Sequence, residues 1–74
     1  MAFIYMAGGW ELNAHEETRD SLTEKMAQAA DVLPVQLMFP HRVGTRQAGS
    51  VTLAVRQIAV VSDQQLPRAG LGER

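Results

Sequence analysis

Residues 49–63, GSVTLAVRQIAVVSD, decide the fold of this 74-residue chain. From position 51 to position 61 the residues that are not apolar are Thr52, Arg56 and Gln57. Because successive side chains of a strand point to opposite faces, a strand built from this run is apolar on both of its faces. The apolar positions are odd-numbered before Arg56 and include the even-numbered ones after Gln57, so the pattern changes phase at this pair. We therefore predict a bulge or a change of pairing partner there.

Two shorter segments also predict strands. Residues 2–7, AFIYMA, are rich in strand-forming residues and end at Gly8-Gly9, which predicts a turn. Residues 35–40 alternate between larger apolar side chains and a second face that is only partly polar. Pro40 has no N–H to donate, so this strand is expected at an edge or with a bulge. The glycine-containing loop 44–50 then joins it to the opening run as a hairpin.

A helix is predicted between the first two of these strands. Ser21 and Glu24 form the S-x-x-E pattern of a capping box, and Asn13 with Glu16 is a second, weaker start signal. The helix is expected to end near Asp31, before Pro34. Its apolar stripe has the spacing of one helix face and consists of Leu22, Met26, Ala29, Ala30 and Leu33.

The order strand, helix, strand, strand predicts a small α+β domain over residues 1–63, with one amphipathic helix on a three-stranded sheet. Residues 64–74 are expected to form a flexible tail. One helix covers one face of a sheet, and burying each large apolar side chain on the other face is worth roughly 1.5–3 kcal/mol. We expect a second copy or a larger protein assembly to cover that face, or a packed tail or longer helix to cover part of it. The predicted interface residues are Phe3, Ile4, Met38, Leu53 and Val60.

Composition narrows the class of protein. The chain has no cysteine, so it has no disulfide and no thiolate metal site, and self-association remains as the means of supporting a small core. Residues 1–33 hold six acidic and two basic residues, and residues 34–74 hold two acidic and five basic ones, all arginine. Such a chain could pair head-to-tail with its copies, although arginine-rich codon usage also explains the bias. The net charge of −1 argues against a general role in coating nucleic acid.

The sequence carries neither a secretory nor a membrane signal. No Lys or Arg precedes the first apolar stretch, which Gly8-Gly9 interrupts. No apolar run approaches the roughly 18 residues that a membrane span needs. We therefore expect a cytoplasmic protein with no membrane partner.

No catalytic or cofactor motif is complete. His15 and Glu16 begin the zinc-protease pattern H-E-x-x-H, but Arg19 stands in place of the second histidine. Neither a G-x-S-x-G elbow nor a phosphate-binding glycine pattern is present. We assign no catalytic residue, no metal and no cofactor, and expect Trp10 to lie over the core rather than in an interface. One loop gathers hydrogen-bonding side chains that could bind a phosphate or a partner's carboxylate: His41, Arg42, Arg46, Gln47 and Ser50.

The predicted order of elements resembles that of the small tautomerases, whose subunits assemble into hexamers through sheets that are apolar on both faces. Tautomerases use an amino-terminal proline, and here the second residue is Ala2, so the catalytic group that the resemblance implies is missing. We expect a non-enzymatic structural or accessory subunit. The alternative is a small oligomeric enzyme or anion-binding module with a site at a subunit boundary.

Overall fold

Residues 49–63 belong to two strands rather than to one. Strand β4 (Arg46–Ala54) is followed by a 3-10 turn (Val55–Gln57) and by strand β5 (Ile58–Ser62). β4 pairs with strand β3 (Val32–Pro40), whereas β5 pairs with strand β1 (Ala2–Met6) and forms the opposite edge of the sheet. The change of partner predicted at Arg56-Gln57 is therefore confirmed.

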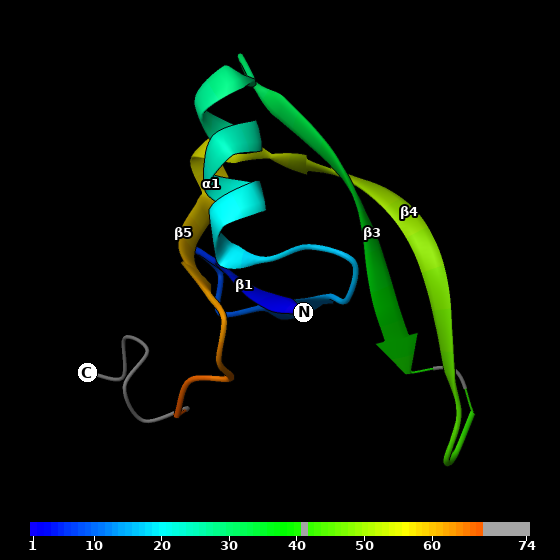
Figure 1. Ribbon diagram of the computed structural model, residues 1–74. Coiled ribbons are helices and arrows are strands. Elements are labelled where there is room, and N and C mark those ends of the chain that lie inside the picture. The colour runs from blue at the N-terminus through cyan, green and yellow to red at the C-terminus, as the bar shows by residue number, and fades with distance from the viewer. Residues whose placement is uncertain (41, 68–74) are drawn as a thin grey trace.

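The computed structural model describes residues 1–40 and 42–67, which form an α+β fold with one helix and a five-stranded antiparallel sheet (Figure 1). The strand order is β4-β3-β2-β1-β5. The remaining elements are β1 (Ala2–Met6), β2 (Glu11–Ala14), helix α1 (Arg19–Gln28) and β3 (Val32–Pro40). The α+β class is as predicted, but the sheet has five strands instead of three because β2 was missed and the last run divides into two.

Strand β2 forms with β1 a hairpin that the sequence did not reveal. The tight turn is closed by hydrogen bonds from the Met6 N–H to the Trp10 carbonyl and from the Gly9 N–H to the Met6 carbonyl, both 2.9 Å. Gly9 has a φ of 96°, a conformation that glycine adopts without strain. The extra strand also interrupts the order of elements on which the resemblance to the tautomerases rests.

The N-cap of helix α1 lies three residues before the Ser21 cap that we expected. This residue is Thr18, whose Oγ1 accepts a hydrogen bond from the Ser21 N–H while the Ser21 Oγ accepts one from the Thr18 N–H. Asp63, just after β5, accepts a hydrogen bond of 2.8 Å from the Arg19 N–H and places a negative charge at the helix N-terminus. The helix ends at Gln28, so the expected stripe is cut short and Leu33 belongs to β3.

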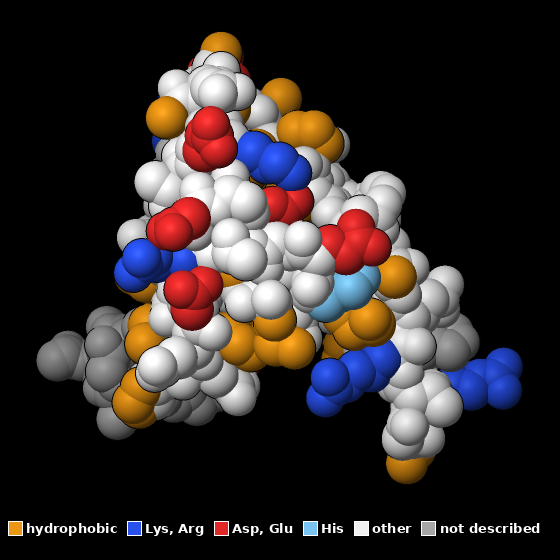
Figure 2. Space-filling view, viewed as in Figure 1, with side chains coloured by type: hydrophobic (Ala, Val, Ile, Leu, Met, Phe, Trp, Pro, Cys, Tyr) orange, Lys and Arg blue, Asp and Glu red, His pale blue; other side chains and the backbone are white. Residues whose placement is uncertain are grey.

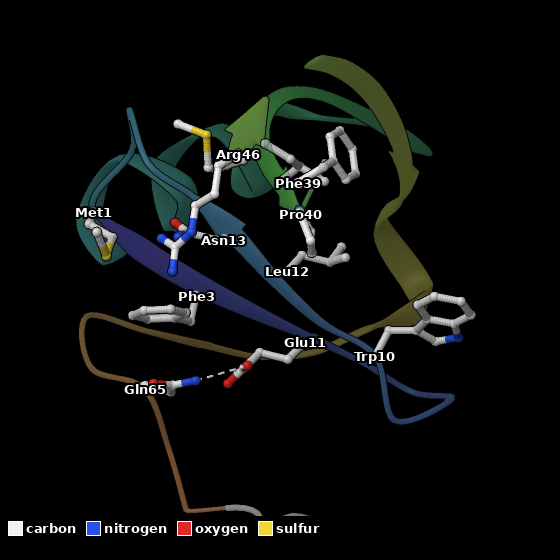
Figure 3. Close-up of a pocket in the computed structure, with 12 residues that line it drawn as sticks. Met1, Phe3, Trp10, Glu11, Leu12, Asn13, Phe39, Pro40, Arg46 and Gln65 are labelled. Carbon is white, nitrogen blue, oxygen red and sulfur yellow. Dashed lines mark hydrogen bonds between the residues drawn. The ribbon is translucent and has the colours of Figure 1, made fainter. Parts of the chain in front are cut away.

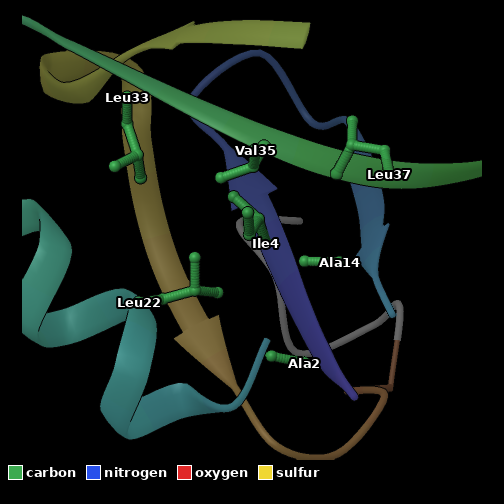
Figure 4. Packing of buried hydrophobic residues seen from close by; sticks show 7 residues of the cluster. All are labelled: Ala2, Ile4, Ala14, Leu22, Leu33, Val35 and Leu37. Carbon is green, nitrogen blue, oxygen red and sulfur yellow. The ribbon is translucent and has the colours of Figure 1, made fainter. Parts of the chain in front are cut away.

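The core lies between α1 and the face of the sheet that α1 covers, here called the concave face (Figure 4). Leu22 is the buried residue of the helix, and Ile4 of β1 is completely buried beneath it. Strand β3 contributes alternate residues from Leu33 to Leu37. The buried cluster consists of Ala2, Ile4, Ala14, Leu22, Leu33, Val35 and Leu37.

The opposite face of the sheet, here called the open face, is partly covered by the segment after β5. Tyr5 lies on this face but is only 4% exposed. Its hydroxyl accepts a hydrogen bond of 2.7 Å from the Leu66 N–H and donates one of 2.7 Å to Glu11. The Gln65 amide donates to the other oxygen of Glu11. This part of the predicted tail therefore packs on the sheet, as one of our alternatives allowed, and residues 68–74 lie outside the described part.

Candidate functional site

The predicted anion-binding loop is divided between two structures. Arg42 lies in the turn that joins β3 to β4, where its carbonyl accepts a hydrogen bond of 2.8 Å from the Thr45 N–H. Arg46, Gln47 and Ser50 lie on β4 rather than in a loop. His41 lies outside the described residues.

Strand geometry separates these residues further. Arg46 and Ser50 lie on the open face, since they pair across the sheet with Pro40 and Gln36, but four residues along a strand span roughly 13 Å. The Ser50 hydroxyl accepts a hydrogen bond from Gln36. Gln47 points to the concave face. Among the four of these residues that the structure describes, Arg46, Gln47 and Ser50 therefore do not surround one ligand.

Arg46 instead joins a pocket that the sequence did not indicate. Strands β2 and β3 are connected by one residue pair, Asn13 with Met38, whereas β3 and β4 pair along their whole length. Beyond that pair the strands diverge and leave a pocket of about 600 Å³ that we call the seam pocket (Figure 3). Its lining comes from strands β1 to β4, the first residue, the β1–β2 turn and the segment after β5: Met1, Phe3, Trp10, Glu11, Leu12, Asn13, Leu37, Met38, Phe39, Pro40, Arg46 and Gln65.

The seam pocket has an apolar wall and two polar groups that are free to bind. Phe3 and Met38 are half-buried in it, and the Arg46 guanidinium points across the sheet toward Phe3 and Asn13 (Figure 3). The Asn13 Oδ1 is buried and accepts no hydrogen bond within the described chain. Glu11 lies at the other end of the pocket, where Tyr5 and Gln65 occupy both of its carboxylate oxygens.

The predicted interface residues fall on two different faces. Phe3, Met38 and Val60 lie on the open face, and Val60 is 37% exposed. Ile4 and Leu53 lie on the concave face, where Ile4 is fully buried within the chain and Leu53 is half-buried at the sheet edge. The period-two pattern identifies which residues share a face but not which face the helix covers.

Trp10 is also placed differently from our expectation. It follows the β1–β2 turn and is 70% exposed at the rim of the seam pocket, so it does not cover the core. Gly8 lies against its indole ring. An exposed tryptophan beside an apolar pocket is the type of residue that often dominates a binding surface.

Strand β4 forms one outer edge of the sheet and is nine residues long. After Arg46 it contains neither a charged residue nor a proline, the two features that usually protect an exposed edge from pairing with another strand. On its concave face Val51 and Leu53 are half-exposed because α1 lies over the other end of the sheet, against β5 (Figure 1). This edge therefore combines unpaired backbone with exposed apolar surface.

Charge is distributed unevenly over the surface. Figure 2 shows acidic side chains over α1 and arginine at the tip of the β3–β4 hairpin. Glu17 differs from these surface acidic side chains because it is buried and yet ionised. Burial by itself would raise the pKa of Glu17, but hydrogen bonds from Lys25 and Ser21, together with the charge of Lys25, outweigh burial and hold the pKa below its ordinary value. The Glu17 carboxylate stabilises the start of the helix. Ser21 and Lys25 already donate hydrogen bonds to its two oxygens, so it is not available for chemistry.

Within residues 1–40 and 42–67, no three His, Asp or Glu side chains converge in a way that could hold a metal ion. His15 lies 3.7 Å from its neighbour Glu16, and its Nδ1 is buried without a partner in that part of the chain.

Within residues 1–40 and 42–67, helix α1 is too short and too polar to cross a bilayer.

The chain shows no significant similarity to any family model, curated protein or solved structure with which it was compared.

Proposed function

We propose that this protein is a non-enzymatic accessory subunit that associates with a second copy of itself along the edge strand β4. The observation that carries the proposal is the unprotected edge: nine residues at the margin of the sheet, without charge or proline after Arg46. An edge of this kind favours the addition of another strand because its outward N–H and C=O groups lack partners in the sheet. The absence of cysteine suits a reducing compartment such as the cytoplasm.

The apolar side chains of β4 support the same surface. Val51 and Leu53 contact the core on one side and remain half-exposed on the other, and Val55 continues this row into the 3-10 turn. Each of them would lose further contact with water if a strand lay beside β4. Removing apolar area from water stabilises an interface by about 25 cal/mol per Å² before the costs of association are subtracted.

The sequence of β4 is suited to a copy of itself. When two β4 strands pair antiparallel around a two-fold axis at Thr52, Val51 lies opposite the partner's Leu53, and Leu53 lies opposite the partner's Val51. Thr52 then faces the partner's Thr52, a cross-strand pair that is favourable in sheets. A two-fold axis uses one surface on both copies, so these matches occur twice. The product is a continuous sheet made from both five-stranded sheets.

A charge placed at the axis tests the proposal. Thr52 is exposed on the open face, so Thr52→Lys leaves the fold of one chain intact but sets two lysines opposite each other in the pair. Gln28→Lys, at the exposed end of α1, adds the same charge away from the edge and is the control. Light scattering coupled to size exclusion should give the wild type and the control twice the 8.1 kDa mass of one chain, and Thr52→Lys a mass near 8.1 kDa.

Two results would reject this function. One is a wild-type chain that stays at 8.1 kDa up to roughly 1 mM, a range that covers even weak association. The other is a dimer whose dissociation constant is the same for Thr52→Lys and for the control. The second result would retain self-association but assign it to another surface.

A further inference from the structure

The seam pocket contains groups that self-association through β4 does not use. We propose that it binds a small aromatic carboxylate that carries a hydrogen-bond donor next to its carboxylate group. The chemistry follows from the anion-binding side chain, the unpartnered acceptor and the apolar wall that the pocket brings together.

Arg46 defines the anionic end of the ligand. Its guanidinium presents a planar set of N–H donors that fits a carboxylate. Within the described residues, the basic side chains that lie close to a carboxylate are those of His15, Arg19 and Lys25, so Arg46 has no carboxylate partner there. The nearest acidic residue in the lining, Glu11, already accepts hydrogen bonds from Tyr5 and Gln65. Arg46 is exposed and lines the pocket, so its guanidinium is available to the carboxylate of a ligand.

Asn13 defines the donor. Its Oδ1 is buried and has no hydrogen-bond partner in the described chain, although buried acceptors in proteins are nearly always satisfied. The Asn13 side chain and the Arg46 guanidinium point toward the same region of the pocket (Figure 3). A hydroxyl or amino group on the carbon next to the ligand carboxylate would reach Asn13 while the carboxylate contacts Arg46.

Phe3 and Met38 define the apolar body. Both side chains are half-buried and line the pocket. Met1 and Phe3 lie on the same side of the pocket as the Arg46 guanidinium (Figure 3). An aromatic ring packs favourably against a phenyl ring in an offset or edge-on arrangement and against a thioether. The volume of about 600 Å³ falls within the range of ordinary ligand pockets.

This inference is independent of the proposed function. Pairing of two β4 strands about Thr52 places residues 50–54 of the two copies opposite each other, and Arg46 lies four residues before that stretch. The pocket is therefore accessible in one copy and in the pair, and a failure of either proposal leaves the other unaffected.

Three matched probes test the ligand class on the wild-type chain. 3-Phenyllactate has the ring, the carboxylate and the hydroxyl, 3-phenylpropionate lacks the hydroxyl, and 3-phenylpropane-1,2-diol lacks the carboxylate. Trp10 is the single tryptophan of the chain and lies at the pocket rim, so its fluorescence reports binding, and amide NMR shifts locate it. We expect 3-phenyllactate to bind at least about tenfold more tightly than the diol, because a hydrogen bond to a charged group is stronger than one between neutral groups. It should also bind several-fold more tightly than 3-phenylpropionate, which leaves Asn13 unpaired.

A pair of arginine variants completes the experiment. Arg46→Gln should remove the preference for 3-phenyllactate over the diol, whereas Arg56→Gln, an exposed arginine outside the pocket, should keep it. The proposal is wrong if roughly 10 mM 3-phenyllactate changes neither the fluorescence of Trp10 nor the amide signals of Phe3 and Asn13, since that concentration would detect even millimolar affinity. It is also wrong if Arg46→Gln binds 3-phenyllactate as tightly as the wild type.

Discussion

Leu22 attaches the helix to the sheet, so its truncation measures how much of the fold depends on that contact. It is fully buried and is the buried residue of α1, facing Ile4 and the first half of β3 (Figure 4). Leu22→Ala removes three buried carbon atoms and leaves a cavity, which costs about 3 kcal/mol at a site with no solvent exposure. A domain of this size is stabilised by roughly 5 kcal/mol or a little more, so the variant should lose about half of its stability. The melting temperature should fall by roughly 10–20 °C.

Urea denaturation followed by circular dichroism measures the loss. Glu24→Ala changes an exposed residue of the same helix and should shift the free energy of unfolding by less than about 0.5 kcal/mol. All proteins are compared at one concentration, because self-association raises the apparent stability. A loss below about 1 kcal/mol in Leu22→Ala would refute the placement of Leu22 in the core, since every fully buried leucine should cost more.

Two further substitutions test the polar contacts. The pKa of Glu17 is lowered in the folded state, so its contribution to stability is present above pH 4.5 and is lost as the pH falls through the folded value. Glu17→Gln should therefore destabilise the protein at pH 7 by about 1 kcal/mol and flatten the loss of stability in acid, which urea titrations between pH 7 and pH 3 would check. Tyr5→Phe removes the acceptor of the Leu66 N–H, so the amide of Leu66 should exchange with solvent several-fold faster while β1 amides keep their protection, as hydrogen-exchange NMR would reveal. Burial raises the pKa of Tyr5, so in the wild type the stabilisation by the protonated Tyr5 hydroxyl is complete below pH 10 and is lost as the pH rises through the pKa of the folded state. Tyr5→Phe should lack that loss of stability in alkali.

The sequence predicts the elements whose own residues carry a strong pattern. The change of phase at Arg56-Gln57 indicates the break between β4 and β5 because a strand that changes its apolar parity has to change what it packs against. The helical spacing of apolar residues predicts the helix, although the expected N-cap is Ser21 and the observed one is Thr18. Thr18 and Ser21 cap each other with two hydroxyls, and this pair lacks the glutamate by which a capping box is usually recognised.

Strand β2 was missed because its stability comes from its neighbours. Its four residues, ELNA, are half polar, and Asn13 and Glu11 point to the open face. Pairing with β1 and the tight turn at Gly9 make it a strand, and neither contact is visible in its own composition. A turn signal at Gly8-Gly9 between two short segments was the available evidence for a hairpin.

The candidate sites depend on contacts between segments that are distant in the sequence. The seam pocket exists because β2 and β3 diverge after a single pair, which no local pattern encodes. Arg46 was singled out as part of a polar loop, but the strand places it apart from Gln47 and toward Phe3. Alternation correctly groups residues of one strand by face, whereas the choice of the covered face depends on where α1 packs.

The pairing of two β4 strands is tested most directly by isotope-filtered NOE measurements on an equal mixture of labelled and unlabelled chains, which detect contacts between copies only. The expected result is a set of intermolecular contacts between the methyl groups of Val51 and those of the partner's Leu53. Intermolecular contacts confined to Phe3 and Met38 on the open face, with none from β4, would contradict the account.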